Sequence, residues 1–336
     1  MKKMKTKKKI LIIITTILLI VLAIFLAIYL YYNSKISKIT HVDIPKKREE
    51  LNIAPTIEKT LDDDYVNILL LGIDTRDPNT DTGRSDTNMI LTLDKKHNKI
   101  KLASIMRDSL MTMKGQGPMA GQNQDRLNHA FAYGGAVLTL KTINENFKLN
   151  LQNYIKVDFA GLEKIIDYVG GVPINITSEE VTVANSYIKE EANLLKVKPT
   201  LITKAGLQNL NGMQALGYGR IRYVGNADYQ RTERQRTVLD QLIKKLSSIG
   251  INKMPEVLDT LLPYTETSLN KGQINDLGSY VLLNKVSTIE QTRLPLDNAS
   301  QWKAVYNNTY FLVWDKDKNI DALHKFIFEE DSDKSK

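Results

Sequence analysis

The sequence predicts an α/β domain preceded by one transmembrane helix, and three observations lead to this prediction. Short apolar runs bounded by turn residues begin at Asn67 and fit strands of a buried sheet, although periodicity alone leaves buried helix open. Later segments read as strand, helix and strand in turn, an order typical of layered α/β domains. Ahead of them lies a long run without charge, residues 10–32.

Residues 10–32 form the predicted anchor. At ~1.5 Å per residue, these 23 residues span roughly 35 Å as a helix, enough to cross a bilayer core. A cleaved signal peptide usually has a shorter apolar core. Here the run ends in three interfacial tyrosines, and the lysines of residues 1–9 favour a cytoplasmic N-terminus. We expect a single-pass protein at the cell membrane, with an extracellular stalk over 33–63 and an extracellular domain after it.

The composition narrows the kind of site. Cysteine is absent, which excludes disulfides, thiolate metal sites and cysteine nucleophiles. The four histidines lack HExxH spacing, so an oxygen-bound hard ion is favoured over zinc. The net charge is +8, but six lysines lie in the first nine residues, and the remaining chain carries about +2. The basicity is therefore weak evidence for nucleic acid, and we expect no nucleic-acid partner.

The stretch from Asn67 to Asp108 contains the first candidate site. Strands over NILLLGID, NMILTLD and IKLASI would place Asp74, Asp86 and the Arg107–Asp108 pair at strand ends or in the loop between strands. Ligand sites in α/β sheets favour that edge. Carboxylates and arginines together suit a divalent cation and a phosphate, although each of these charges is also typical of a solvated loop. The loop lacks the oxygen spacing of an EF-hand.

The following segments continue the α/β pattern. NYIKVD reads as a strand ending at Asp158, which can N-cap the next helix. That helix stops at Gly170-Gly171, and VPINI resumes as a strand. Residues 177–204 read as an irregular insertion, and residues 250–336 as scaffold with a polar tail.

Four arginines and a glutamine form a second candidate cluster. Arg220 and Arg222 are two residues apart, so on a strand they share a face. The long helix that follows puts Arg231, Arg234 and Gln235 at i, i+3 and i+4, again on one face. Cations are unfavourable in the first turns of a helix. A bound anion would explain them there, and a solvated basic face is the alternative.

Five blocks, in this order, resemble the LytR–CpsA–Psr family of cell-wall glycopolymer ligases from mostly Gram-positive bacteria. They are NILLLGID with GRSDTNMILTLD, SIMRDS, RLNHAFAYGG, VDFAGLEKIIDYVGGV, and ALGYGRIRY followed by DYQRTERQ, over residues 67–235. The resemblance implies a mixed central sheet wrapped by helices, which we expect over 64–330, with a polar tail at 331–336. It also implies transfer of a phosphoglycopolymer, of teichoic acid or capsule type, from a polyprenyl-pyrophosphate carrier to a peptidoglycan muramic acid hydroxyl.

The resemblance implies a role for each matching residue. Asp74 and Asp86 match carboxylates associated with Mg²⁺, the implied cofactor. The positions matching pyrophosphate-binding residues are Arg84, Arg107, Arg126, Arg220, Arg222, Arg231 and Gln235. Catalysis falls to Asp74, Arg107 and Asp108, with Asp74 the candidate for taking the acceptor proton and Asp108 orienting arginines. Two positions depart from the common pattern: Arg126 stands where lysine is usual and Met106 where proline is usual, and the first keeps a cation with planar geometry.

Rival functions are weighed against the same residues. A glycosidase using Asp74 and Asp86 leaves the arginines unexplained, and a serine hydrolase lacks GxSxG and a serine partner for His129. A non-catalytic, membrane-anchored wall-polymer-binding or regulatory protein stays open. A polyprenyl carrier further requires an apolar groove between sheet and helices, and we expect its mouth beside Arg107 and Arg220. The apolar residues of strands and helices would otherwise simply fill the core.

Overall fold

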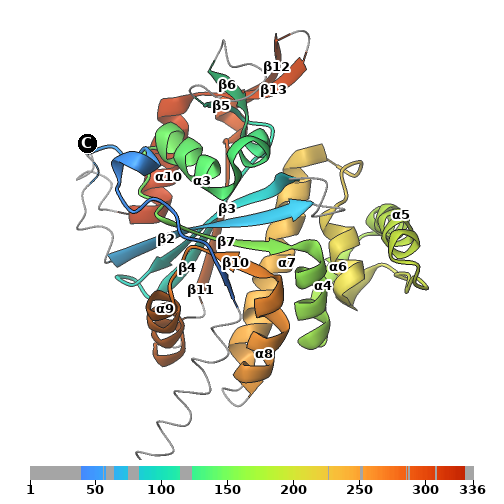
Figure 1. Ribbon diagram of the computed structural model, residues 1–336. Helices are drawn as coiled ribbons and strands as arrows, with labels where there is room; N and C mark the ends of the chain where they lie inside the picture. Colours follow the sequence, from blue (N-terminus) through green and yellow to red (C-terminus); the bar gives the residue numbers. More distant parts are fainter. Residues whose placement is uncertain are drawn as a thin grey trace, which may run out of the picture.

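A seven-stranded mixed sheet forms the centre of the molecule (Figure 1). The computed structural model describes residues 39–55, 57, 64–74, 83–113, 123–225, 227–249, 253–284, 286, 288–306 and 309–329. In spatial order the strands are β1 (Thr40–His41), β10 (Thr265–Thr267), β7 (Asn153–Asp158), β2 (Tyr65–Asp74), β3 (Arg84–Asp94), β4 (Lys99–Ile105) and β11 (Thr288–Leu294). The pairs β1–β10, β7–β2 and β4–β11 are parallel and the others antiparallel.

Helices cover both faces of the sheet. They are α3 (Leu127–Phe147), α4 (Phe159–Tyr168), α5 (Ser178–Leu195), α6 (Gly212–Gly219), α7 (Ala227–Ser248), α8 (Met254–Leu261), α9 (Lys271–Leu283) and α10 (Lys316–Phe328). In Figure 1, α3 and α10 lie on one side of the sheet, and α4, α7, α8 and α9 on the other. The predicted mixed α/β sheet wrapped by helices is confirmed.

Three two-stranded ribbons and three short 3₁₀ helices complete the described chain. The ribbons are β5–β6 (Leu110–Thr112 and Gln124–Arg126), β8–β9 (Val172–Ile176 and Gly206–Leu210) and β12–β13 (Ser300–Tyr306 and Thr309–Trp314). The 3₁₀ helices are η1 (Glu49–Leu51), η4 (Leu262–Tyr264) and η5 (Asp297–Ala299).

Strict alternation along β2 separates the two layers. Leu69 and Leu71 pack into the core under α3 and α10, whereas Leu70 and Gly72 face the helices on the other side. Because successive side chains of a strand point to opposite faces, an apolar run such as NILLLGID serves both layers. A side chain at position 72 would meet Thr87, since a Cβ there lies 2.9 Å from the threonine Cβ. Glycine therefore keeps this part of the second layer open.

Asp86 lies in a strand and not in the loop where the sequence placed it. β3 begins at Arg84, and Ile73 pairs with Ser85 while Gly72 pairs with Thr87, which leaves Asp86 as an extra residue. Such a bulge redirects a side chain at a strand end. The end of β2, the start of β3 and the end of β4 consequently share one edge of the sheet, as the sequence predicted.

Part of the expected stalk is folded onto the domain. Within 33–63, Thr40–His41 extend the sheet by pairing with β10. Leu51 and Ile53 are buried, and Asn144 donates a hydrogen bond of 2.9 Å to the Leu51 carbonyl. Burial of these two apolar side chains explains why a polar, proline-containing segment takes a fixed path. The expected anchor, residues 10–32, lies outside the described residues, and none of the described helices is long and apolar enough to span a membrane.

The expected irregular insertion contains a regular helix, α5. The Thr177 hydroxyl caps it by accepting a hydrogen bond from the Glu180 amide. The Glu180 carboxylate in turn accepts from the Thr177 amide, and the two bonds form a capping box. Its buried face consists of Glu180, Ala184, Ile188 and Ala192 at four-residue spacing. Small residues on that face make the apolar pattern weak, so the composition resembled a loop. α5 packs against α6 and lies beyond α4 at the edge of the molecule (Figure 1).

Candidate functional site

Five charged side chains form a chain of contacts at the edge where β3 begins and β4 ends. We call them the rim cluster: Asp86, Arg107, Asp108, Arg126 and Arg222. Arg107 Nη1 donates to Asp86 Oδ1 at 2.7 Å, and Arg222 Nη2 lies 3.5 Å from Asp86 Oδ2. Arg107 Nε lies 3.3 Å from Asp108 Oδ2, and Arg126 Nε lies 3.5 Å from Asp108 Oδ1. Each carboxylate thus holds two arginines in place.

The start of α3 positions the turn that carries Arg107 and Asp108. The Asn128 amide donates to the Arg107 carbonyl at 3.1 Å, and the Leu127 amide donates to the Ser109 carbonyl at 3.1 Å. Amides in the first turn of a helix have no acceptor inside that helix. Here the carbonyls of the turn accept from them, so the hydrogen bonds satisfy donors of α3 and acceptors of the turn together. The motifs SIMRDS and RLNHAFAYGG therefore meet in space although residues 110–125 separate them in the sequence.

Arg126 is held on three sides. Besides Asp108, its Nη2 donates to the Tyr310 carbonyl at 2.8 Å, and its guanidinium lies 5.3 Å from the centre of the Phe311 ring. A planar fork of five donors is a property that lysine lacks. The replacement of the usual lysine by arginine is thus accommodated by β13.

Arg220 and Arg222 do not lie on a strand, contrary to the prediction. Arg220 is the C-cap of α6, and the residues after it form no strand. Arg220 Nη1 bonds Glu191 Oε2 at 3.1 Å, whereas Arg222 approaches Asp86. The alternation of three residues was too short to establish a strand, and the packing of α6 against α5 decides where Arg220 points. The two arginines therefore reach different partners.

α7 carries Arg231, Arg234 and Gln235, and Gln235 lines the cavity between this helix and the sheet. Arg231 is buried, with an exposed fraction of 2%. Arg234 Nε donates to Glu180 at 2.8 Å, and its other nitrogens donate to the carbonyls of Ile221 and Val224. Arg234 thus fastens the segment containing Arg222 to α5 and α7, which is a structural role.

Asp74 and Arg84 occupy opposite positions in the β2–β3 ladder. Arg84 is exposed, and the side chain of Asp74 lies outside the described residues. The backbone of both residues lies at the same edge as the rim cluster, because β2 ends and β3 begins there.

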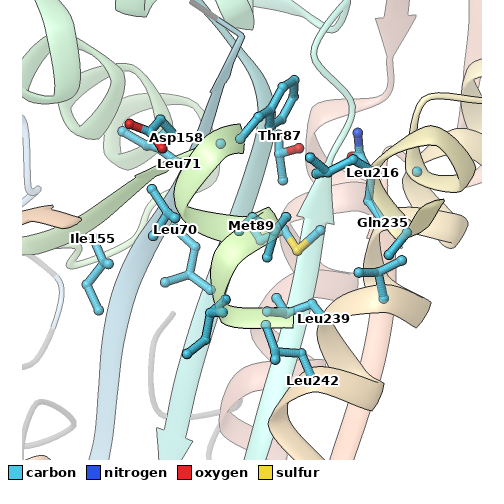
Figure 2. Close-up of a pocket in the computed structure, with 18 of the residues that line it drawn as sticks. Leu70, Leu71, Thr87, Met89, Ile155, Asp158, Leu216, Gln235, Leu239 and Leu242 are labelled. Atoms are coloured by element: carbon cyan, nitrogen blue, oxygen red, sulfur yellow. The ribbon is translucent and has the colours of Figure 1, made fainter. Parts of the chain in front are cut away.

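An apolar cavity of about 240 Å³ lies between the sheet and helices α4, α6 and α7 (Figure 2). Leu70, Met89 and Ile155 line it from the strands, and Leu239 and Leu242 from α7 (Figure 2). The predicted groove between sheet and helices is confirmed.

The lining of this cavity also includes polar residues. Arg220 and Gln235 belong to its lining, together with Asp158. Of the two arginines expected at the mouth, Arg220 is therefore confirmed as a lining residue, whereas Arg107 is outside the lining and belongs to the rim cluster. A ligand with an anionic head and an apolar tail matches this combination of surfaces.

The donor set of Asp86 is compatible with Mg²⁺. Its Oδ1 accepts from Arg107, while Oδ2 lies 3.5 Å from Arg222, beyond an N–H···O hydrogen bond. A half-buried carboxylate oxygen with remaining acceptor capacity is the hard donor that Mg²⁺ takes, usually with one or two carboxylates, water and substrate phosphate. The residues present therefore fit the ion that the resemblance implies.

A second charged group has metal-ligand spacing but lies at the opposite end of β3 and β4. We call it the Lys101 network: Asp94, His97, Lys99, Lys101 and Glu329. Lys101 Nζ lies 2.7 Å from Asp94 and 3.0 Å from Glu329, and Lys99 Nζ lies 2.9 Å from Glu329. Because the ammonium groups already neutralise the carboxylates, we assign no metal there.

Comparison with known proteins agrees with this geometry. A sequence profile of the LytR_cpsA_psr family matches residues 26–325. The chain belongs to this family. The resemblance drawn from the five sequence blocks is thereby confirmed.

Similar proteins include named teichoic acid transferases and proteins of solved structure. The chain is similar to a polyisoprenyl-teichoic acid–peptidoglycan teichoic acid transferase, TagU, of Bacillus mycoides, with 31% identity over 86% of this chain and 87% of the relative. It resembles the structure of TagT bound to LI-WTA, with 23% identity, a TM-score of 0.64, and coverage of 86% of this chain and 100% of that one. It also resembles TagT with bound octaprenyl pyrophosphate lipid, with 22% identity, a TM-score of 0.60, and the same coverage of both chains. The solved structures share the fold.

Two groups of polar residues near the site escaped the sequence reasoning. Asp125, His129 and Tyr133 form a hydrogen-bonded cluster at the start of α3. Their four-residue spacing is a signal that the sequence contains, since residues i and i+4 of a helix are neighbours.

Arg236 and Arg293 form the other group that was missed. Burial, together with the charge of Arg293, lowers the pKa of Arg236 to about 10. Arg293 stacks on Tyr229, with 4.3 Å between its guanidinium and the ring centre. Neither arginine has a sequence signal that separates it from ordinary surface charge, because tertiary packing alone brings α7 onto β11.

Proposed function

We propose that this chain is a membrane-anchored phosphotransferase that moves a phosphoglycopolymer from a polyprenyl-pyrophosphate carrier to a muramic acid hydroxyl of peptidoglycan. The observation that carries the proposal is the apolar cavity whose lining includes Arg220 and Gln235, beside a rim rich in arginine. A lipid with a pyrophosphate head requires both surfaces. Relatives named as teichoic acid transferases support the reaction class, and teichoic acid is the favoured polymer over a capsule.

The arginines would neutralise the pyrophosphate. A pyrophosphate diester resists nucleophilic attack until its negative charge is balanced. Arg107, Arg126 and Arg222 are pre-positioned by Asp86 and Asp108, so they need no reorganisation when charge develops on the departing phosphate. Arg84, Arg220, Arg231 and Gln235 complete the proposed head-group site. Asp108 contacts two of these arginines and is proposed to orient them.

Mg²⁺ is the proposed cofactor, held by Asp74 and Asp86. When bound, it would supply further positive charge to the phosphate oxygens. Asp74 is thereby assigned to the ion. The other residues would hold the lipid head, exclude water through the apolar cavity wall, and take the proton from the acceptor hydroxyl.

The proposal includes a location. Lysines ahead of the uncharged residues 10–32 support a cytoplasmic N-terminus and an extracellular domain. Protease added to intact protoplasts should then digest the chain beyond residue 33, and full protection would contradict the topology.

Reconstitution tests the reaction itself. Full-length chain in detergent is incubated with synthetic polyprenyl-pyrophosphate saccharide, peptidoglycan fragments and Mg²⁺, and a new phosphodiester together with released polyprenyl phosphate is expected. Lipid binding without turnover would favour the alternative, a non-catalytic wall-polymer-binding or regulatory protein. Omission of the acceptor is the control for hydrolysis.

A further inference from the structure

Asp125, His129 and Tyr133 form a compact acid–imidazole–phenol cluster where β6 passes into α3. His129 Nδ1 lies 3.0 Å from Asp125 Oδ2, and the Tyr133 hydroxyl donates to the same oxygen at 2.8 Å. The Arg126 amide donates to Asp125 Oδ1 at 2.7 Å. The Asp125 side chain is 4% exposed and that of His129 19%. The carboxylate is therefore enclosed, while the imidazole retains access to the surface.

The partners of Asp125 fix the tautomer of His129. Burial would raise the pKa of Asp125, but hydrogen bonds from His129, Tyr133 and the Arg126 amide outweigh burial and lower it. An ionised carboxylate only accepts hydrogen bonds, so the imidazole proton lies on Nδ1. In the neutral imidazole Nε2 then carries the lone pair, and none of the described residues donates to it. This is the arrangement in which a carboxylate orients a histidine for proton transfer.

The cluster borders the rim cluster on two sides. Asp125 immediately precedes Arg126, whose Nε lies 3.5 Å from Asp108. The amide of Asn128, next to His129, binds the Arg107 carbonyl. On its other side, the charge of Arg84 acts on the Tyr133 hydroxyl. His129 is consequently adjacent in sequence to Asn128, whose amide binds the turn that carries Arg107 and Asp108.

The other candidate bases near the rim are already engaged. Both Asp86 and Asp108 contact two arginines, and in the proposed function Asp74 binds Mg²⁺. A carboxylate held in this way serves charge balance and orientation. An imidazole with a lone pair on Nε2 can accept a proton from a hydroxyl.

We propose that Nε2 of His129 accepts the proton of the acceptor hydroxyl, with Asp125 as a positioning residue. The inference rests on the proposed function. The acceptor oxygen forms a bond to the phosphorus that carries the glycopolymer, and its proton moves to His129. The bond from that phosphorus to the bridging oxygen breaks, and its electron pair leaves with polyprenyl phosphate. The imidazolium then returns its proton to the released phosphate or to water.

Variants of the full-length chain test this role. His129→Gln should slow transfer by about 100-fold or more, because general base catalysis contributes effects of that size. Binding of polyprenyl pyrophosphate should change by less than about twofold, since His129 is assigned to the acceptor hydroxyl and not to the head-group site. His41→Gln is the matched control, because His41 lies on β1 and contacts Leu269 and Asp43. Asp125→Asn should lower the transfer rate while leaving lipid binding intact.

Chemical rescue and the pH profile separate catalysis from structure. In His129→Ala, added imidazole should restore part of the transfer rate and should not affect His41→Ala. The pH–rate profile of the wild type should contain a limb that is absent in His129→Gln. That variant keeps the other two members of the cluster, Asp125 and Tyr133, and the neighbouring Arg84, Arg107 and Arg126. A difference between its pH profile and that of the wild type therefore reports on the imidazole alone.

The outcomes distinguish this role from the proposed function. A wild-type chain that transfers polymer, beside a His129→Gln variant with an unchanged rate and pH profile, would overturn the role of His129 alone. A wild-type chain that binds the lipid and transfers nothing would overturn both. A slow His129→Gln variant that imidazole rescues in the alanine form would support the role.

Discussion

The two charged clusters at opposite ends of β3 and β4 contain similar residue types and serve different purposes. In the Lys101 network, the side chains of Asp94 and Lys101 are fully buried and lie 2.7 Å apart. In the rim cluster, the side chain of Arg222 is 38% exposed and its contact to Asp86 measures 3.5 Å. The Lys101 network is therefore buried with short ion-pair distances, and the rim cluster is more exposed with longer ones.

The two clusters also differ in the ratio of hydrogen-bond donors to acceptors. Lys101 donates to the Ile327 carbonyl and contacts two carboxylates, so all three ammonium hydrogens have acceptors. In the rim cluster three guanidinium groups offer about fifteen N–H donors, while the two aspartates present four oxygens. An excess of cationic donors at an accessible edge indicates an anionic ligand, whereas a saturated buried network indicates a structural role. Charge alone does not distinguish the two.

The largest expected effect is on stability, in the Lys101 network. Lys101→Met leaves the buried Asp94 carboxylate without its ammonium partner, and breaking a buried pair on one side costs about 3–5 kcal/mol. We expect that loss in the free energy of unfolding measured in denaturant. The double variant Lys101→Met/Asp94→Asn is the control and should recover part of the loss, because it removes the stranded charge. A loss below about 1 kcal/mol in the single variant would contradict the structural role.

The next effect is on catalysis, in the rim cluster. Arg107→Ala removes a donor aimed at developing charge, and such removal costs about 100- to 1,000-fold in rate. We expect transfer to fall by that factor while the unfolding free energy changes by less than about 1 kcal/mol, since Arg222 remains beside Asp86. Release of polyprenyl phosphate measures the rate. Activity within threefold of the wild type would remove Arg107 from the proposed site, and Arg48→Ala, in the segment before β2, is a control outside it.

The elements that the sequence predicts correctly are those with a local signal. β2, β3 and β4 were predictable because each is a continuous apolar run between turn residues, and α4 was predictable because Asp158 caps it. The bulge at Asp86 was not, since it depends on how β2 and β3 pair. Bulges of this kind are set by the partner strand and leave no composition signal.

Site residues divide in the same way. The aspartates and arginines at strand ends were predictable from strand order, and the family motifs named the rest. The paths of Arg220 and Arg222 were not, because the contacts of Arg220 to Glu190 and Glu191 depend on a helix, α5, whose apolar pattern is weak. The Asp125–His129 contact had a readable four-residue spacing but needed the β6–α3 junction to show its direction.

A smaller effect compares two arginines with different partners. Arg222→Ala should weaken binding of polyprenyl pyrophosphate about tenfold, the value of one charge-assisted hydrogen bond of roughly 1.5 kcal/mol. Arg220→Ala should cost about threefold, because Arg220 already bonds Glu191 and stacks on Tyr187. Titration of the lipid against each variant measures both. A larger loss of lipid affinity in the Arg220 variant than in the Arg222 variant would contradict the proposal that Arg222 contributes more to binding.

The smallest effect is a pH dependence in the Lys101 network. Hydrogen bonds from Lys99, and then from Lys101, lower the pKa of Glu329 from 4.5 to about 2. A carboxyl with a lowered folded-state pKa stabilises the protein above pH 4.5, and this contribution is lost as the pH falls toward 2. Because Glu329 is partly exposed, Glu329→Gln should cost only about 1 kcal/mol at pH 7. The difference in unfolding free energy between variant and wild type should vanish near pH 2, and a difference that grew on acidification would contradict the assignment.

The central claim is that one site combines an apolar cavity with a cationic rim. Burying ten methylenes contributes about 8 kcal/mol before ordering costs, far more than any single polar contact of the head group. Isothermal titration of the full-length chain with long-chain polyprenyl pyrophosphate and with inorganic pyrophosphate tests this directly. The control variant Leu239→Trp, which fills the cavity, should weaken binding of the lipid and spare that of inorganic pyrophosphate. We predict at least a hundredfold tighter binding of the lipid by the wild-type chain; equal affinity for the two ligands would show that the cavity takes no lipid tail and would contradict the account.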